Sequence, residues 1–165
     1  MDLKTAAWLD QEDARITAMI RRYGWVITYV SPSSGDGTGP AGAGLGGPSF
    51  AYTTGLFGLG HAELLVFGVC PHVAGVVLDA VAGRVRAGEN LVPGQPVEVG
   101  GCPFIPEEVP NSGQILFDAN RFYARPQRHP VPALQLSYPD DDGRYPWEPG
   151  FAEPDRQPRP GTFRA

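Results

Sequence analysis

Apolar residues with helical spacing mark two stretches in the first half of the chain. From Ile16 to Tyr23, the residues at i, i+3, i+4 and i+7 are all apolar, which places them on one face of a helix. Asp10 is suited to the N-cap, and Gly24 is suited to the position that ends a helix. We therefore predict the first helix between these two residues.

A second helix is predicted from Pro71, a residue favoured in the first helical turn, to a stop at Gly88. Its apolar residues are mainly valines at spacings of three and four. Gly75 and Gly83 lie within it, and each should weaken the helix by roughly 1 kcal/mol relative to alanine. We interpret these glycines as sites of close packing against a sheet.

Three segments of the first half have the composition of β-strands. Trp25–Val30 is β-branched or aromatic at nearly every position, so we expect a strand with both faces covered. Phe50–Thr54 and Leu64–Val69 predict the next two strands, separated by a glycine turn and a short polar loop.

The second half of the chain contains shorter strand candidates between turns. Pro96–Gly100 is one candidate and Gln114–Asn120 is a stronger one. Ala133–Tyr138 alternates between apolar residues on one face and polar residues on the other, which predicts a strand. Pro139–Gly143 follows as a turn.

Two segments carry no helix or strand signal. Residues 31–49 are rich in glycine, so we predict a flexible loop, either an inert insertion or a cover over a site. Residues 148–165 are rich in proline and predict an extended tail, preceded by Trp147, which we expect to seal a sheet edge or a pocket mouth. We expect one domain over residues 1–147 with an α+β fold, in which two principal helices pack on a mainly antiparallel sheet.

Composition narrows the classes of function. The chain has 165 residues, of which 42% are hydrophobic and 19% charged, and this suits one soluble globular domain. The net charge is −5 and no segment concentrates lysine and arginine, so we expect no nucleic-acid binding. No apolar run is long enough for a bilayer and no signal peptide is recognisable, so we predict a cytoplasmic protein without a membrane partner.

Hydroxyl and titratable side chains are concentrated around one glycine, Gly55. This glycine permits a backbone turn or a close approach that other residues resist. Tyr52 and Thr53 precede it on opposite faces of a strand, and His61 and Glu63 follow it. We predict that Tyr52, Thr53 and Gly55 contact a ligand, and that His61 and Glu63 form a catalytic acid–base pair in which Glu63 orients the imidazole.

A structural role for the same residues is the alternative. His61 would then cap the loop, and Glu63 would accept hydrogen bonds from backbone N–H groups and fix the turn. Arg121, next to two aromatic residues, is a candidate ligand-binding residue for a phosphate or carboxylate. Its alternative is an ion pair with an acidic residue such as Asp118.

No metal site is predicted. A metal held by His61 and Glu63 needs a third ligand, and His72 would lie at the far end of a strand, roughly 20 Å away. Cys70 and Cys102 match no metal-ligand spacing and are expected to be small buried or half-buried side chains. The sequence identifies no cofactor.

Four blocks of sequence occur in an order that is similar to a known family. They are Tyr23-Gly-Trp-Val26, Phe50-Ala-Tyr-Thr-Thr-Gly-Leu56, His61-Ala-Glu-Leu-Leu-Val-Phe-Gly68 and the segment from Gln135 to Trp147. Together they resemble the bacterial family called domain of unknown function 4262, over about Ile16 to Trp147. Thr54 stands where that family usually has an aliphatic residue, and Ala62 replaces a common proline. The resemblance supports the fold and the choice of site, and it implies no activity.

Three functions remain open from the sequence. The first is the binding of a small organic ligand in a pocket near residues 50–63, with His61 as general acid or base if the protein is an enzyme. The second is a protein-interaction or homo-oligomerisation module that uses the aromatic and proline-rich residues 145–151. The third is a flavin-binding barrel, in which short strands and an arginine hold a phosphate.

Overall fold

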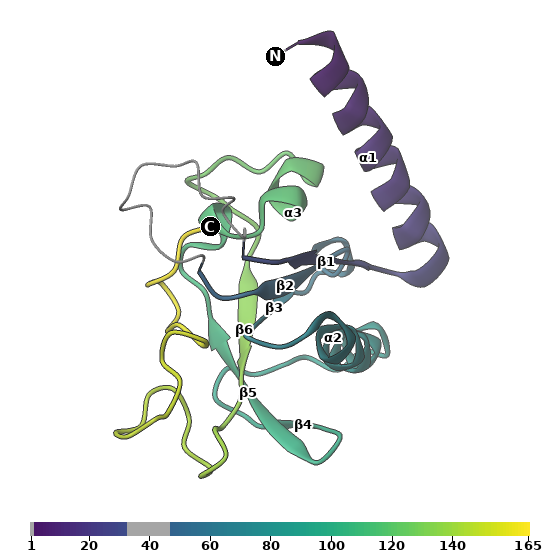
Figure 1. The fold of residues 1–165 in the computed structure, drawn as a ribbon. Coiled ribbons are helices and arrows are strands. Elements are labelled where there is room, and N and C mark those ends of the chain that lie inside the picture. The colour runs from purple at the N-terminus through teal and green to yellow at the C-terminus, as the bar shows by residue number, and fades with distance from the viewer. Residues whose placement is uncertain (1, 33–46) are drawn as a thin grey trace, which may run out of the picture.

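The computed structural model describes residues 2–32 and 47–165 and shows an α+β fold on one six-stranded sheet (Figure 1). Most of the predicted glycine-rich loop, residues 31–49, lies outside the described residues. The strand order is β1 (Val26–Val30), β2 (Phe50–Thr54), β3 (Glu63–Phe67), β6 (Ala133–Ser137), β5 (Cys102–Glu108) and β4 (Val97–Val99). Neighbouring strands are antiparallel except β3 and β6, which are parallel. The predicted α+β class with a mainly antiparallel sheet is confirmed.

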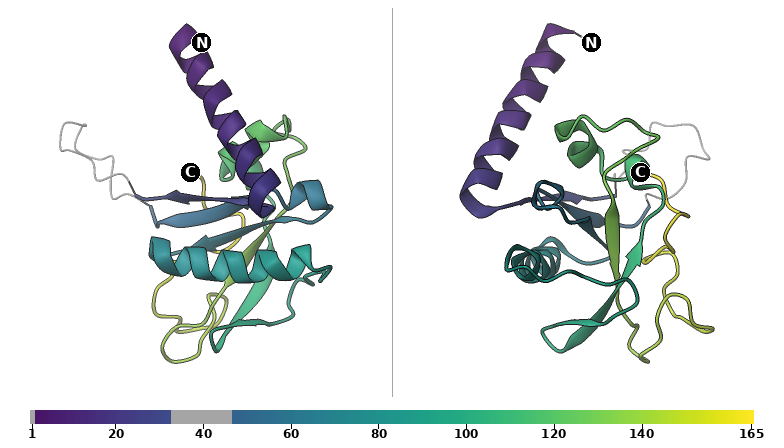
Figure 2. Two further views of the ribbon diagram at one scale, coloured as in Figure 1. Left: turned by 90° about the vertical axis from the view of Figure 1, so that its right-hand side faces the viewer. Right: turned by 180° about the vertical axis from the view of Figure 1, so that it is seen from behind.

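One face of the sheet is covered by α2 (Pro71–Arg86), which lies across the strands (Figure 2). Leu78 and its neighbours on this helix pack against Leu64 of β3 and Leu136 of β6 in a first hydrophobic core. Each of these leucines is fully buried. Full burial of a leucine side chain contributes roughly 1.5–3 kcal/mol, so this face supplies much of the stability.

The opposite face of the sheet carries a second core under α3 (Phe117–Phe122). Tyr52 and Phe67 pack there with residues of α3 and with Phe163 from the C-terminal segment. The rings of Phe67 and Phe163 meet edge to face, with centroids 5.1 Å apart. Residues 138–165 contain turns without helix or strand, and Phe163 holds their end against the sheet.

The first helix, α1 (Leu3–Tyr23), begins earlier than predicted. The assignment of Asp10 as the N-cap is wrong, because Asp2 caps the helix and its side chain accepts a hydrogen bond from Thr5 N at 2.8 Å. Gly24 ends the helix with a φ of 97°, as predicted. The periodic apolar stripe therefore marks only the C-terminal half of a longer helix.

The N-terminal half of α1 stands away from the sheet (Figures 1 and 2). Ile16 is buried, whereas Trp8 is 58% exposed. The Arg121 guanidinium of α3 reaches Asp13 at 3.1 Å, so an ion pair links the middle of α1 to the body. Among the described helices, none is both long and apolar enough to span a bilayer.

Apart from Gln114–Asn120, the predicted strands and the second helix are found within one or two residues of their expected bounds. β1 is an edge strand, in which Val26 is buried and the other four residues are half-buried. Ile27 and Tyr29 pack against the first core and Val30 packs against the second, so both faces of this strand are covered in part. A strand at the edge has a neighbouring strand on one side only, which leaves its side chains partly exposed.

The predicted strand Gln114–Asn120 is wrong, because this segment contains the end of a 3₁₀ turn, Ser112–Gln114, and the start of α3. The Asn120 side chain explains the difference. Its Nδ2 donates to Leu116 O at 2.9 Å, and its Oδ1 accepts from Val131 N at 2.9 Å. These bonds fix a helical turn that the spacing of apolar residues does not reveal.

The strand β5 was not predicted, because Pro103 and Pro106 lie within it. Pro103 is in register only with β4, and Pro106 only with β6. The Pro106 carbonyl accepts from Gly94 N at 2.9 Å, on the side away from β6. Since the N and C=O of one strand residue point to the same side, the missing N–H of Pro106 removes no bond between β5 and β6.

Gly75 and Gly83 of α2 face open space, because no neighbouring atom lies within 4 Å of a Cβ added at either position. The interpretation that they mark close packing against the sheet is wrong. We expect Gly83→Ala to raise the free energy of unfolding by roughly 0.5–1 kcal/mol, because alanine loses less backbone entropy in a helix. Urea denaturation measures this change, and a less stable variant would contradict the open environment of Gly83.

Candidate functional site

Glu63, the first residue of β3, is completely buried, and the turn after β2 encloses its carboxylate. Oε1 accepts hydrogen bonds from Gly55 N and Phe57 N at 2.9 and 3.0 Å. Oε2 accepts from Thr53 Oγ1 and Leu56 N at 2.7 and 3.3 Å. Four donors converge on one carboxylate, as in the backbone nests that bind anions. Glu63 therefore acts as an internal anion that holds the turn between β2 and β3.

The environment of Glu63 favours this structural role over catalysis. Burial raises the pKa of its carboxyl above the ordinary value, because the carboxylate loses hydration, while the hydrogen bonds from Thr53 and the backbone oppose the rise. A carboxylate with no exposed surface and with both oxygens hydrogen-bonded offers no free acceptor to a substrate. The catalytic assignment of Glu63 stays a prediction.

Gly55 allows the turn to touch the end of α1. Its φ is 138°, and a Cβ at this position would lie 2.6 Å from Gly24 O and 2.8 Å from Trp25 Cα. Two of the sequence blocks described above thus meet through direct backbone contact. The sequence predicted that Gly55 permits either a backbone turn or a close approach by another group. The group that approaches closely is the protein's own backbone, at Gly24 and Trp25.

His61 lies beside this turn without a hydrogen bond to Glu63. Its Nδ1 lies 2.7 Å from Ala62 O, and its Nε2 accepts from Leu91 N at 3.4 Å. The neutral ring with the proton on Nδ1 satisfies both contacts. His61 thus connects the β2–β3 turn to the loop that follows α2, and the two side chains do not form the predicted acid–base pair.

Tyr52 and Arg121 lie on the face of the sheet that α3 covers, where Asp118 bridges them. Asp118 N donates to Tyr52 Oη at 3.2 Å, and Arg121 Nη1 donates to Asp118 Oδ1 at 2.8 Å. Burial raises the pKa of the Tyr52 hydroxyl, which stays protonated. The ion pair with Asp118 is the alternative that the sequence left open for Arg121. The predicted ligand-binding residues therefore separate into two groups on opposite faces of the sheet.

Thr54 carries a buried hydroxyl without a hydrogen-bond partner among the described residues. An unpaired buried hydroxyl costs roughly 1–3 kcal/mol. An aliphatic residue at position 54 would avoid this cost.

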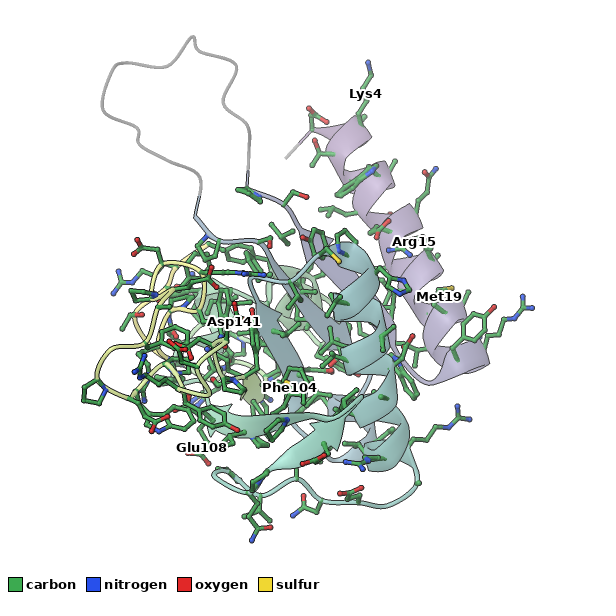
Figure 3. The ribbon with its side chains drawn as sticks, turned by 60° about the horizontal axis from the view of Figure 1, so that its bottom comes forward. Lys4, Arg15, Met19, Phe104, Glu108 and Asp141 are labelled. Atoms are coloured by element: carbon green, nitrogen blue, oxygen red, sulfur yellow. The ribbon has the colours of Figure 1, made fainter. Side chains whose placement is uncertain are left out.

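A cavity of about 880 Å³ lies beside the predicted site, between β5, β6, the loop before β4 and the C-terminal segment. Most of its wall is proline and aliphatic side chains. Figure 3 shows the labelled Glu108 at the end of β5, near the C-terminal segment. The wall consists of Ala62, Pro93, Gly94, Ile105, Pro106, Glu107, Glu108, Val109, Pro110, Pro132, Ala133, Leu134, Trp147, Arg159 and Pro160.

Trp147, Arg159 and Glu107 form the polar corner of this cavity. Arg159 Nη2 donates to Glu107 Oε1 at 3.1 Å, and the guanidinium carbon lies 5.4 Å from the centre of the Trp147 ring. Ser137 Oγ donates to Glu107 Oε2 at 2.8 Å, and Tyr145 stacks on Trp147 with ring centroids 4.8 Å apart. The corner therefore combines an aromatic face with a carboxylate held in a fixed orientation.

Two of these residues were not identified from the sequence. Glu107 lies in the strand that its prolines conceal, and Arg159 lies in the proline-rich tail. The position of Arg159 between two prolines was the available signal, since a charged side chain on a rigid segment is held in one direction. Trp147 was expected at a pocket mouth or a sheet edge, and it lies in the cavity wall.

A second groove of about 570 Å³ lies between α1, β1 and α2, and Figure 3 labels Arg15 and Met19 in its wall. The charged side chains of this groove and the Trp25 indole are already paired. Trp25 Nε1 donates to Asp79 Oδ1 at 2.8 Å, and Arg15 forms an ion pair with Glu12. This groove offers no comparable set of polar groups for a ligand.

Comparison with known proteins gave one match. A family model described as Domain of unknown function (DUF4262) matches residues 19–152. The searches of curated proteins and of solved structures returned no match. The matched residues include Glu63, Glu107 and Trp147, whereas Arg159 lies beyond them.

Proposed function

The chain belongs to the DUF4262 family, whose description names no activity, and we propose that it binds a small organic ligand in the cavity of about 880 Å³ beside Ala62. The wall of this cavity is the observation that carries the proposal. Small-molecule sites typically have volumes of about 300–1,000 Å³, with apolar walls and a few polar groups that orient the ligand. The polar corner of Trp147, Arg159 and Glu107 supplies such groups at one end.

The proposal also gives His61 and Glu63 a role. Ala62 lies between them in the chain and contributes to the wall. Glu63 holds the turn, and the bond between His61 Nε2 and Leu91 N ties that turn to the loop that bears Pro93 and Gly94. In this proposal both residues position the wall, and neither touches the ligand.

The two other functions have less support. A partner-binding segment at residues 145–151 would present free aromatic side chains, but Trp147 is stacked on Tyr145 and lies against the Arg159 guanidinium. A flavin-binding barrel needs a closed sheet, whereas the described strands leave two edges, at β1 and at β4. The cavity is therefore the feature that we carry forward.

We expect benzylurea, a neutral aromatic probe, to shift the backbone amide NMR signals of Ala62, Gly94 and Leu134 together in a titration. Trp147→Ala should weaken this binding by about 5-fold, because it removes an aromatic wall worth about 1 kcal/mol in ring contacts. Trp8→Ala, on the exposed part of α1, is the matched control. The proposal fails if benzylurea and its charged analogues all leave these signals unchanged, or if both variants bind as the wild type does.

A further inference from the structure

Arg159 indicates which chemical group the polar corner accepts. Its guanidinium contacts the Glu107 carboxylate at 3.1 Å and lies over the Trp147 ring at 5.4 Å from the ring centre. A carboxylate and an aromatic face are the two groups that bind guanidinium and ammonium ions in proteins. We propose that the ligand of this cavity is an organic cation and that Arg159 occupies its subsite in the free protein. This inference rests on the proposed function.

The charges of the wall favour a cation over an anion. The Glu107 carboxylate faces the one guanidinium of the wall, that of Arg159. Glu108, the next residue of β5, pairs with Leu134 of the core under α2 and points to the opposite face of the sheet. If Arg159 moves away, the polar corner retains only negative charge. An anionic ligand would meet repulsion from Glu107, whereas a cation replaces the charge that Arg159 removes.

Glu107 is prepared to bind a cation. Its side chain is 19% exposed, and the buried Ser137 hydroxyl donates to Oε2, which leaves Oε1 directed at the guanidinium. A carboxylate fixed by a neighbouring hydroxyl loses little freedom when a ligand binds. The carboxylate half of the subsite therefore exists before any ligand arrives.

The Arg159 side chain is held less firmly than the Glu107 side chain. Its side chain is 44% exposed, and its ion pair with Glu107 is formed through one nitrogen, Nη2. Ion pairs this exposed contribute little to stability. Arg159 also lies beyond the residues that match the family, whereas Glu107 and Trp147 lie within them. The subsite is thus formed by the family domain, and its internal occupant is added by the C-terminal segment.

An internal occupant lowers the apparent affinity for an external ligand. The observed affinity falls in proportion to the fraction of molecules in which Arg159 has left the subsite. Removal of the guanidinium therefore strengthens the binding of an external cation. A neutral molecule of the same shape gains much less, because it does not use the Glu107 charge.

The test compares benzylguanidinium with benzylurea, its neutral isostere, and with phenylacetate as an anion. Each is titrated against the wild type, Arg159→Ala and Arg159→Ala/Glu107→Gln, and the amide signals of Ala62, Gly94 and Leu134 are followed. We expect Arg159→Ala to bind benzylguanidinium about 10-fold more tightly than the wild type does. Benzylurea should gain less than about threefold, and Glu107→Gln should remove the gain for the cation.

Other outcomes separate this inference from the proposed function. If the wild type prefers phenylacetate and Arg159→Ala loses it, Arg159 anchors an anion, so the cation inference fails while the cavity remains a binding site. Equal affinities of Arg159→Ala for benzylguanidinium and benzylurea would also overturn the inference. If none of the three probes shifts the cavity signals in any variant, the proposed function fails as well. Arg159→Gln, which keeps part of the aliphatic stem, repeats the test should Arg159→Ala disturb the fold.

Discussion

Glu63→Ala is expected to lower the free energy of unfolding by at least about 3 kcal/mol. The substitution leaves the N–H groups of Gly55, Leu56 and Phe57 without their acceptor, and each unsatisfied buried group costs about 1–3 kcal/mol. It also opens a cavity at a fully buried position. Domains of this size are stable by about 5–15 kcal/mol, so the variant loses a large part of its stability. Urea denaturation followed by circular dichroism measures the loss.

Glu108→Ala is the matched control for this prediction. Glu108 is an exposed glutamate at the end of β5, so its removal should change stability by less than about 0.5 kcal/mol. Similar midpoints for Glu63→Ala and the wild type would mean that the carboxylate does not hold the turn. In that case the catalytic assignment of Glu63 would regain weight.

Gly55→Ala is expected to destabilise the protein by about 2–6 kcal/mol, which at the upper end prevents folding. The added Cβ would lie 2.6 Å from Gly24 O and 2.8 Å from Trp25 Cα, so the backbones of β2 and of the α1 end would have to separate. Overpacking costs about 1–3 kcal/mol, and a side chain at a φ of 138° adds strain of about 1–3 kcal/mol. The melting temperature and the yield of soluble protein report the effect.

Gly88→Ala separates the two causes. Gly88 has a φ of 101°, and no atom lies within 4 Å of a Cβ added there. This variant therefore carries the conformational strain without the clash, and it should lose about 1 kcal/mol. If Gly55→Ala and Gly88→Ala lose equal stability, the contact between the β2 turn and α1 contributes nothing.

The elements that could be predicted from the sequence bury the residues that their periodicity indicates. The alternation in β6 placed Leu134 and Leu136 on one face, and both belong to the core under α2. The six-residue α3 depends instead on the distant bond from Val131 N to Asn120, which no local pattern contains. In β5 the prolines are compatible with a strand only because each lacks a paired neighbour on one side, and that depends on the topology.

The candidate site was predictable to a smaller extent. Two roles for Glu63 were open from its sequence context, and the choice between them depends on where the N–H groups of residues 55–57 point. The cavity was not predictable, because its wall combines segments that lie far apart in the chain, from Ala62 to Pro160. Only the arrangement of the sheet brings these segments together.

The parallel pairing of β3 with β6 has a consequence for how the protein is made. It joins residues 63–65 to residues 133–135, whereas β1, β2 and β3 pair with near neighbours in the chain. On the ribosome, the apolar edge Leu64–Phe67 therefore stays open until most of the chain has been synthesised. An unpaired apolar edge is where another unfinished chain can add a strand. The risk of aggregation through this edge is thus highest during synthesis, and it falls once β6 has paired with β3.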